Sequence, residues 1–407
     1  MCLIIIDMDI SKNVLILGNG GRERVIFDKL NNENVYILDT WKFDEISDFC
    51  NNNNINIVIP GSEIYLCRGI TDHITKNTNS LVFGPNYEQA KLEGSKYISK
   101  KVMLELGIPT ASFMYYDKEI NKLLDNYIWE SKPGYVIKYS GLANGKGVYL
   151  PNNKKEALDA INKLLELNKN NWEGLLIEER LYGTEVSVMG FCNGNDCYLM
   201  PQAQDYKRVY NGDEGLNTGG MGAICPVNIL NKEELNIIKM FMVNVVKKYN
   251  YIGVLYAGIM KTKEGIYFLE FNCRFGDPEA QVILNLLNSD LYNLIVSCIK
   301  KESIKIKWKN SYAAAVVLSH KDYPRSKLEK PIEISIERLD ESCILYNSNV
   351  NYINEKPYTT GGRVMTLVSI SDTLVKALNN IYSNIKKINY HNIHYRTDIG
   401  VNNINLD

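Results

Sequence analysis

The sequence predicts a multidomain protein of mixed α/β and α+β class, in which a parallel α/β domain comes first. Strand-like apolar segments alternate with helical segments from Asn13 to Phe83, as in a parallel sheet that helices cover on both faces. Farther along, short strands joined by glycine-rich turns are typical of α+β modules. The length of 407 residues allows roughly two to four domains, each with a core of its own.

The first part of the chain is predicted to contain short parallel strands connected by helices. A glycine-rich turn follows the first strand, and a helix begins directly after it. The polar run 51–54 is interpreted as a solvated loop. We assign strands to residues 13–17, 35–38, 55–59 and 81–83, and a helix to residues 23–30.

The central part begins after Gly84-Pro85 with a long helix from about residue 88 to residue 106. Gly107 and Pro109 form its stop signal. A small α+β module set within a larger one is predicted next. We assign strands to 135–138, 147–150, 174–177, 185–190, 256–261 and 266–271, helices to 154–167 and 233–249, and a glycine-rich loop to 212–222.

The last part, from about Ser311, is predicted to be a separate β-rich domain. We assign strands to residues 313–318 and 362–368, and a helix to residues 373–388.

Composition excludes several classes of function. A formal net charge of −1 leaves no electrostatic footprint for nucleic acid or a membrane surface. Nine cysteines without a CxxC pair, beside only four histidines, argue against a zinc site and a disulfide scaffold. The apolar start is too short and lacks the basic residues of a signal peptide, and no run is long enough to span a bilayer. We expect a cytoplasmic protein.

The loop between the first strand and the first helix suits a phosphate monoester. Its glycines let the backbone approach an anion, and N–H groups at a helix N-terminus attract negative charge. NAD is a weaker alternative: Asp39 has the spacing of a ribose-binding acid, but Glu23 stands where a third glycine is needed. A turn that only packs helix on strand is the other alternative. The candidates are Gly18, Gly20, Gly21 and Arg22.

A second glycine-rich loop follows the strand that ends at Lys138. It is not a Walker A loop, because Ser140 replaces the first glycine and a strand follows it in place of a helix. Such a loop can fold over a triphosphate as a lid, with Lys138 facing the α- and β-phosphates. A plain hairpin with exposed lysines is an equal alternative. The loop contributes Gly145, Lys146 and Gly147.

The segment after the strand 174–177 suits an adenosine. Its backbone from Glu178 through Glu179 to Leu181 can offer donors and acceptors to adenine, and the Glu185 carboxylate can accept bonds from ribose hydroxyls. Acids on a solvated turn are the alternative, and the commoner one for such a pattern alone.

The segment 268–279 carries the strongest chemical signal. Glu270 and Asn272 are two positions apart on a strand, so both project from one face. Two oxygen ligands that leave room for water and phosphate oxygens suit Mg²⁺ bound with ATP. Arg274 can clamp a transferring phosphoryl group. Asp277 before Pro278 fits a helix N-cap followed by proline, and for Asp277 this structural role has the same weight as a functional one.

Two further segments could hold substrate. Asp205 lies beside two cations, Lys207 and Arg208, ahead of a glycine-rich loop. This arrangement could hold a zwitterion and a phosphate, whereas an exposed charged loop is the alternative. Gly362 and Arg363 in the last domain could cap an anion, although a hairpin turn is the default. The glycine-rich loop contributes Asn217, Thr218, Gly219, Gly220 and Met221.

In this order the motifs closely resemble the phosphoribosylamine–glycine ligases of the ATP-grasp superfamily, from Asn13 to Gly400. The stretch 270–279 beside 217–223 is the most specific part. The carriers are GNGGRE at 18–23, LEGSK at 92–96, GIPTA at 107–111, VIK at 136–138, GKGV at 145–148, IEE at 177–179, QDYKR at 204–208, LNTGGMGA at 216–223, EFNCRFGDPE at 270–279, TGGRV at 360–364 and RTDIG at 396–400.

The resemblance implies a domain plan and a reaction. We expect an N-terminal α/β substrate domain (1–92), an ATP-grasp domain (93–310) with a lid at about 128–188, and a C-terminal domain (311–407). The implied enzyme, acting as a monomer, joins glycine to 5-phosphoribosylamine through glycyl phosphate, with ATP and Mg²⁺ or Mn²⁺. It yields glycinamide ribonucleotide, ADP and phosphate for purine synthesis.

The resemblance also implies residue roles. Arg274, Asp277, Asp205 and Lys207 act on the two substrates, and Glu270 and Asn272 bind the metal. Phosphoribosylamine and glycine are assigned to the glycine-rich loops at 18–22 and 217–221 and to Gly362 and Arg363. ATP is assigned to Lys101, Lys138, Gly145, Lys146, Gly147, Glu178, Glu179, Leu181 and Glu185.

Three other functions remain open at this point. They are an ATP-grasp ligase with a different amine substrate, a non-catalytic nucleotide-binding derivative, and an NAD-dependent oxidoreductase. Intact Glu270, Asn272 and Arg274 argue against the derivative. The chain departs from the usual family pattern at Arg24, Tyr139, Ser140 and Tyr206.

Overall fold

A computed structural model describes residues 12–30, 34–117, 134–143, 147–169, 171–325, 328 and 330–406. Gly145 and Lys146, two of the candidate nucleotide-binding residues, lie outside this set. Among the described residues, no helix is long and apolar enough to cross a membrane.

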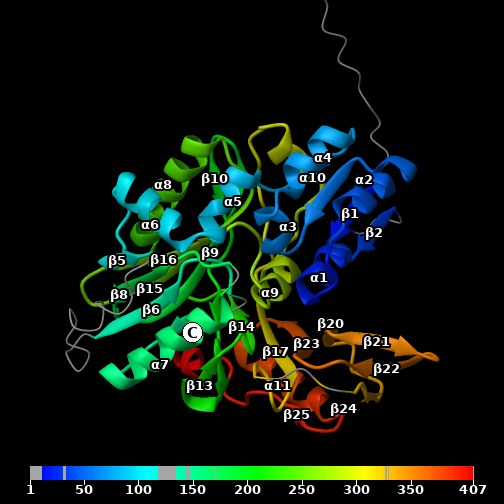
Figure 1. The fold of residues 1–407 in the computed structure, drawn as a ribbon. Coiled ribbons are helices and arrows are strands. Elements are labelled where there is room, and N and C mark those ends of the chain that lie inside the picture. Colours follow the sequence, from blue (N-terminus) through cyan, green and yellow to red (C-terminus); the bar gives the residue numbers. More distant parts are fainter. Residues whose placement is uncertain are drawn as a thin grey trace, which may run out of the picture.

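The N-terminal part forms the predicted parallel sheet, with strand order β2-β1-β3-β4. All four residues of β1 are fully buried, because helices cover both faces of the sheet. Figure 1 shows this unit in blue at the upper right. Its elements are β1 (Val14–Leu17), α1 (Gly21–Leu30), β2 (Val35–Leu38), α2 (Phe43–Asn52), β3 (Ile57–Pro60), α3 (Glu63–Cys67), α4 (Ile70–Asn77) and β4 (Leu81–Val82).

The long helix predicted at 88–106 is wrong, because two helices occupy this stretch. They are α5 (Tyr87–Gly94) and α6 (Lys96–Glu105). Ser95 between them is extended, with φ −135° and ψ 108°, and its Oγ accepts a 3.4 Å hydrogen bond from the Ile98 N–H at the start of α6. The break lets the chain turn, so both helices reach the site described below.

The central part contains two antiparallel sheets. One has the strand order β10-β9-β15-β16, and the smaller one, β5-β8-β6-β7, carries α7 on one face. The elements are β5 (Phe113–Tyr116), β6 (Tyr135–Tyr139), β7 (Val148–Tyr149), α7 (Lys154–Leu167), β8 (Leu175–Glu179), β9 (Thr184–Asn193), β10 (Cys197–Leu199), α8 (Lys232–Tyr249), β15 (Ile252–Lys261), β16 (Ile266–Asn272), α9 (Glu279–Leu286) and α10 (Leu291–Ile299).

The C-terminal sheet has the order β11-β14-β17-β23-β20, and β25 pairs with β17. Two of its strands, β11 (Gln204–Asp205) and β14 (Gly222–Cys225), come from the middle of the chain, so the sheet extends beyond the segment from residue 311 onward. The exact domain limits stay a prediction. The other strands and the helix here are β17 (Tyr312–His320), β20 (Cys343–Asn347), β23 (Arg363–Ser371), α11 (Leu374–Ile385) and β25 (Ile393–His394).

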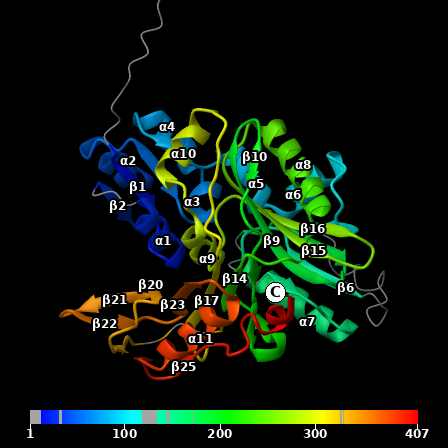
Figure 2. The ribbon, with the colours of Figure 1, turned by 180° about the vertical axis from the view of Figure 1, so that it is seen from behind.

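Short strand pairs complete the structure. The hairpin of β12 (Arg208–Tyr210) and β13 (Glu214–Asn217) has the short helix η2 (Asn211–Asp213) at its tip. Figure 2 shows the second hairpin, β21 (Val350–Ile353) with β22 (Lys356–Thr359), projecting from the C-terminal part. The remaining elements are β18 (Ile332–Glu333), β19 (Ser335–Ile336), β24 (Ile388–Asn389) and η3 (Val401–Leu406).

Helix α9 lies where the three parts of the chain meet (Figure 1). Every one of its residues is buried. One apolar cluster joins Val14 of the N-terminal sheet, Phe191 of β9 and Ala315 of β17 to this helix. The burial of this continuous core holds the three parts together and fixes the geometry of the cavity between them.

Candidate active site

A cavity of about 1180 Å³ lies between the three parts. The N-terminal part contributes Arg22 and Glu63, the central part contributes most of the wall, and the C-terminal part contributes Tyr323 and Arg363. This volume is large enough for a nucleotide and a second substrate together, since single-ligand pockets are usually about 300 to 1000 Å³.

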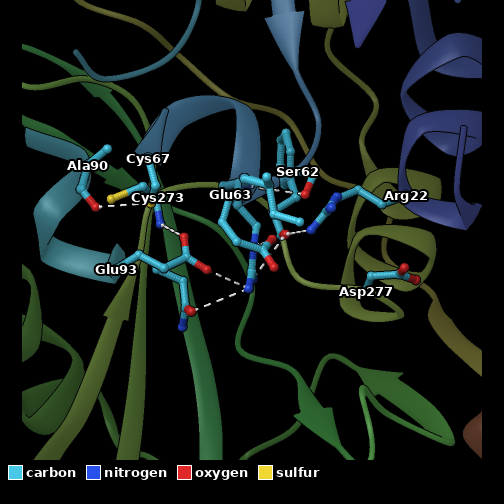
Figure 3. A network of polar contacts seen from close by, with 12 residues as sticks. Arg22, Ser62, Glu63, Cys67, Ala90, Glu93, Cys273 and Asp277 are labelled. Atoms are coloured by element: carbon cyan, nitrogen blue, oxygen red, sulfur yellow. Dashed lines mark hydrogen bonds and ion pairs between the residues drawn. The ribbon is translucent and has the colours of Figure 1, made fainter. Parts of the chain in front are cut away.

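Arg274 stands at the centre of an ionic network on one wall of this cavity. Figure 3 shows the two carboxylates of this network, Glu63 and Glu93. Its Nε lies 3.1 Å from Glu63 Oε2 and its Nη2 lies 2.6 Å from Glu93 Oε1. Burial alone would raise the pKa of Glu63, but Arg274 and Arg22 outweigh it and lower that pKa to about 2. Burial raises the pKa of Glu93 to about 7 even though Arg274 opposes it. One guanidinium therefore serves two carboxylates with different proton affinities.

In the first glycine-rich loop, the carboxylate of Glu23 folds back onto the backbone of the loop. The Gly20 N–H donates a 2.7 Å bond to Glu23 Oε2, and a Cβ on Gly61 would clash with the same carboxylate. A negative charge therefore occupies the helix N-terminus, where a dinucleotide would need its pyrophosphate. Arg22 lines the cavity and donates to the Phe275 carbonyl at 3.0 Å.

The glycines of that loop sit farther back. Gly18, Gly20 and Gly21 are not among the described residues that line the cavity. Their contribution to a phosphate site is therefore still a prediction, and Arg22 is the residue of this loop that reaches the cavity.

Two lysines converge on Glu178 in the wall of the cavity. Lys138 Nζ lies 2.8 Å and Lys100 Nζ lies 3.0 Å from Glu178 Oε2. Burial lowers the pKa of Lys100 to about 8, and the two lysines keep the pKa of Glu178 low although its burial opposes this. Among the described residues, no hydrogen-bond partner reaches Glu178 Oε1, which leaves that atom able to accept a bond from a ligand.

The structure does not bring Lys101, which the resemblance assigns to ATP, to the wall of the cavity. Lys101 is exposed, its Nζ lies 5.5 Å from the ring centroid of Tyr97, and it is not among the described lining residues. Successive helical residues point about 100° apart, so on α6 it is Lys100 that faces the cavity. Gly147, Glu179, Leu181 and Glu185 do line it.

Glu270 and Asn272 lie side by side at the end of β16, as their spacing predicts. Asn272 Nδ2 is 3.5 Å from Glu270 Oε1. Burial tends to raise the pKa of Glu270, but Lys207, Lys96 and Lys138 outweigh it and keep the carboxylate ionised. No group of three or more histidines, cysteines or acids arranged to hold a metal occurs among the described residues. A divalent ion on this pair suits the chemistry of the donors, because Mg²⁺ usually keeps positions for phosphate oxygens and water.

Asp277 and Arg363 connect the central and C-terminal parts. Arg363 Nη2 lies 2.8 Å from Asp277 Oδ2, and its Nη1 donates to the carbonyls of Asp277 and Gly219. Gln281 Nε2 donates to Asp277 Oδ1 at 2.7 Å. The alternative interpretation of Asp277 as an N-cap is wrong, because Pro278 holds the N-cap position of α9.

Asp205 and Lys207 lie beside the glycine-rich turn that follows them. Among the described residues, Asp205 Oδ1 is buried without a hydrogen-bond partner, and burial together with Glu279 raises the pKa of Asp205. Lys207 Nζ lies 3.1 Å from Glu185 Oε2.

Of the turn itself, Asn217, Thr218 and Gly219 line the cavity. The described lining residues do not include Gly220, the fully buried Met221 or Gly362.

Several cavity residues were missed by motif reasoning. Glu279 is buried, and its Oε1 accepts bonds from Tyr256 Oη at 2.6 Å and from Ser187 Oγ at 3.1 Å. Lys96 Nζ donates to the Gly141 carbonyl at 3.2 Å. These residues belong to motifs that the sequence analysis named, because Glu93 and Lys96 lie within LEGSK and Glu279 is the last residue of the stretch 270–279. They received no role because a motif does not show which of its side chains point into the cavity.

Family profiles cover most of the chain in three consecutive blocks. The N domain of phosphoribosylglycinamide synthetase matches residues 32–93, its ATP-grasp (A) domain matches residues 94–280, and its C domain matches residues 313–402. The chain belongs to the phosphoribosylglycinamide synthetase family. It has the N, ATP-grasp and C domains of that family in order.

Relatives of this family match over nearly full length. A phosphoribosylamine–glycine ligase of Caldanaerobacter subterraneus is 36% identical over 95% of this chain and 99% of its own. One from Fusobacterium nucleatum is 36% identical over 95% and 98%. The crystal structure of the Thermotoga maritima phosphoribosylamine–glycine ligase superposes with a TM-score of 0.81 at 31% identity, covering 95% of this chain and 99% of its own.

A more distant structural likeness concerns the fold alone. The biotin carboxylase domain of Hydrogenobacter thermophilus 2-oxoglutarate carboxylase gives a TM-score of 0.73 at 14% identity, over 94% of this chain and 91% of its own. The ATP-grasp architecture is therefore shared with enzymes of different substrate range.

Proposed function

We propose that this protein is an ATP-dependent ligase that joins glycine to 5-phosphoribosylamine, with release of ADP and phosphate. The observation that carries the proposal is the cavity between the three parts, in which an ionised Glu270, next to Asn272, faces several lysines beside residues of the N-terminal part. The nearly full-length match to ligases of this name supports it.

ATP is proposed to lie along the central part of the cavity. Lys138 and Lys100 would hold the phosphates, and Glu179 through Leu181 with Glu185 would receive the adenosine. Glu270 and Asn272 would hold Mg²⁺ or Mn²⁺, which neutralises phosphate charge when it is bound. Glu178 Oε1, which has no hydrogen-bond partner among the described residues, lies in the same wall and can accept a bond from the adenine amino group.

The reaction is proposed to proceed in two transfers. The glycine carboxylate attacks the γ-phosphate, forming glycyl phosphate and ADP; the amine of phosphoribosylamine then attacks the acyl carbon, and phosphate leaves. Lys207 and Arg274 supply positive charge near the transferring group, and Asp205 suits the glycine ammonium. Exclusion of water from the occupied cavity would protect the acyl phosphate from hydrolysis.

The sugar phosphate is proposed to lie between the N-terminal and C-terminal parts. Arg22 and Arg363 are the cations that reach the cavity from these two sides. Because described residues of a single chain build this cavity, we propose that the monomer is the active unit. A cytoplasmic location is a further prediction, from the cysteine pattern.

The experiment is ADP release with ATP, Mg²⁺ and glycine, with and without phosphoribosylamine generated in the assay. We expect sustained ADP release only when both substrates are present, together with formation of glycinamide ribonucleotide, detected by its mass. ADP release that depends on a different amine in place of phosphoribosylamine would show that the second substrate is that amine. Tight ATP binding without turnover under any condition would overturn the ligase assignment.

A further inference from the structure

The segment from Arg396 to Asn403, here called the C-terminal brace, runs along a hairpin that borders the cavity. The hairpin extends from Gln204 to Gly222 and includes β12, η2 and β13. Both ribbon views show the red end of the chain beside the green β13 (Figures 1 and 2). The brace contains the motif RTDIG, to which the proposed chemistry assigns no role.

Arg396 is the centre of the brace. Its side chain is 1% exposed, and its Nε and Nη2 each lie 2.7 Å from the Asp398 carboxylate. Its Nη1 lies 2.7 Å from Asp213 Oδ1 at the tip of the hairpin and donates to the Arg208 carbonyl at 3.2 Å. A guanidinium with a fixed fork of donors holds such partners in one arrangement.

The tip of the hairpin is held by further contacts of the same segment. Asp398 Oδ2 accepts a 2.8 Å bond from the Gly212 N–H. Asn211 Nδ2 donates to Thr397 Oγ1 at 2.6 Å, and Asn211 Oδ1 accepts from the Thr397 N–H at 3.0 Å. Both sides of the tip are therefore attached to three consecutive residues of the brace.

The base of the hairpin is attached through Tyr206. The Arg396 guanidinium lies 5.1 Å from the centroid of the Tyr206 ring, and Tyr206 Oη accepts a 2.9 Å bond from the Gly400 N–H. Tyr206 is buried and is not among the described residues that line the cavity. The departure from the family pattern at this position thus concerns the brace and not the cavity wall.

The residues next to Tyr206 belong to the proposed site. Lys207 pairs with Glu185, and its carbonyl accepts 2.8 Å bonds from both the N–H and the Oγ1 of Thr218. The Met221 N–H donates to the Tyr206 carbonyl at 2.8 Å. A shift of the hairpin would move Lys207 and the turn at 217–219 together.

We propose that Arg396 is a positioning residue, which holds Lys207 and the turn 217–219 against the reacting end of ATP by fixing the hairpin from outside the cavity. The proposal rests on the proposed function. It differs from a merely structural role because it predicts a selective loss: the chemical step suffers, whereas the segment 179–181 proposed to receive adenine, to which the contacts of the brace given above do not extend, keeps its affinity for the nucleotide.

The test compares Arg396→Met with wild type in turnover, nucleotide binding and amide hydrogen exchange. We expect kcat with saturating ATP to fall at least about tenfold, because small misplacements of reacting groups are costly. The dissociation constant for ATP should change less than about twofold. Exchange should accelerate over residues 207–221 but not over β15. The control is Lys387→Met, which removes the ion pair to Asp340 in the same domain and should leave all three readouts unchanged.

Asp398→Asn is the second variant, for the case that Arg396→Met does not fold. It keeps the size of the side chain and weakens the ion pair to Arg396. It should show the same selective pattern in milder form, and Arg396→Lys should restore part of the loss. A folded variant with wild-type kcat and wild-type exchange would overturn the proposal, as would an equal loss of ATP binding. If wild type itself shows no turnover, the proposed function fails, and exchange over 207–221 still decides the role of the brace.

Discussion

Glu270 is the side chain on which the proposed chemistry depends most directly. Its carboxylate faces Lys96, Lys138 and Lys207, and its backbone lies in β16 between apolar neighbours that carry the packing. Glu270→Gln should therefore lower kcat by at least about a hundredfold and leave the far-UV circular dichroism and melting temperature close to wild type. Glu264→Gln, on the exposed turn of the same hairpin, is the matched control and should be fully active. Full activity of the Glu270 variant at ordinary Mg²⁺ concentrations would remove the metal assignment.

Glu93 predicts a pH dependence of stability. Its pKa in the folded protein is about 7, above the ordinary value of 4.5, so the folded state binds this proton more tightly than the unfolded state does. The contribution is complete below pH 4.5 and is lost as the pH rises toward 7. The slope from this residue is up to about 1.4 kcal/mol per pH unit. Urea unfolding across this range measures it.

Wild type and variants are compared by the slope of their unfolding free energy against pH and not by its absolute value, because Glu93→Gln also loses the ion pair to Arg274. Glu93→Gln cannot ionise and should lose the downward slope. Glu88→Gln, an exposed position of the same helix, should keep it. A Glu93→Gln variant that retains the wild-type slope would contradict the raised pKa.

At the scale of one element, two adjacent lysines of α6 test which side of this helix faces the cavity. Lys100 and Lys101 are adjacent, but only Lys100 points to Glu178 and the cavity. Lys100→Met should weaken ATP binding about tenfold, because a charge-assisted contact to phosphate is lost. Lys101→Met should bind ATP like wild type. Isothermal titration with a non-hydrolysable analogue separates the two, and equal losses in both variants would refute the orientation of the helix.

The elements also show what the sequence could predict. The helix 154–167 has the bounds that its periodicity indicates, because apolar residues recur at helical spacing and Asn153 caps its start. The break at Ser95 directly follows Gly94, the last residue of α5, but a glycine inside a helical pattern is often tolerated, so this signal alone does not decide between one helix and two. A serine that caps a helix looks the same in sequence as a serine inside one, and the difference depends on the tertiary turn between α5 and α6.

The residues of the candidate site could also be predicted from the sequence only in part. Glu270 and Asn272 were predictable because two polar positions on one face of an apolar strand require partners. Glu63 was not assigned any role, since its carboxylate meets Arg274 only after three separate segments have packed together. Spacing along the chain identifies residues that share an element, whereas contacts between elements distant in sequence need the fold.

At the scale of the whole molecule, Arg363 joins the C-terminal domain to Asp277, which lies just before α9, and to the turn at Gly219. Arg363→Met would leave Asp277 partly buried without its cation. We expect the free energy of unfolding to fall by about 3 kcal/mol and turnover to fall with it. Arg338→Met, an exposed position in the same domain, should change neither quantity. Guanidinium denaturation beside the ADP assay checks both, and an unchanged unfolding curve for Arg363→Met would show that the contact contributes nothing to stability.

The strand β14 pairs with β17, although about 90 residues of chain separate them. During synthesis, the strand from Gly222 to Cys225 therefore emerges from the ribosome well before the strand that covers its edge. Until then that edge carries open N–H and C=O groups that can pair with another chain. The final assembly of this protein must wait for the residues 312–320, so its middle part completes its folding late, together with its end.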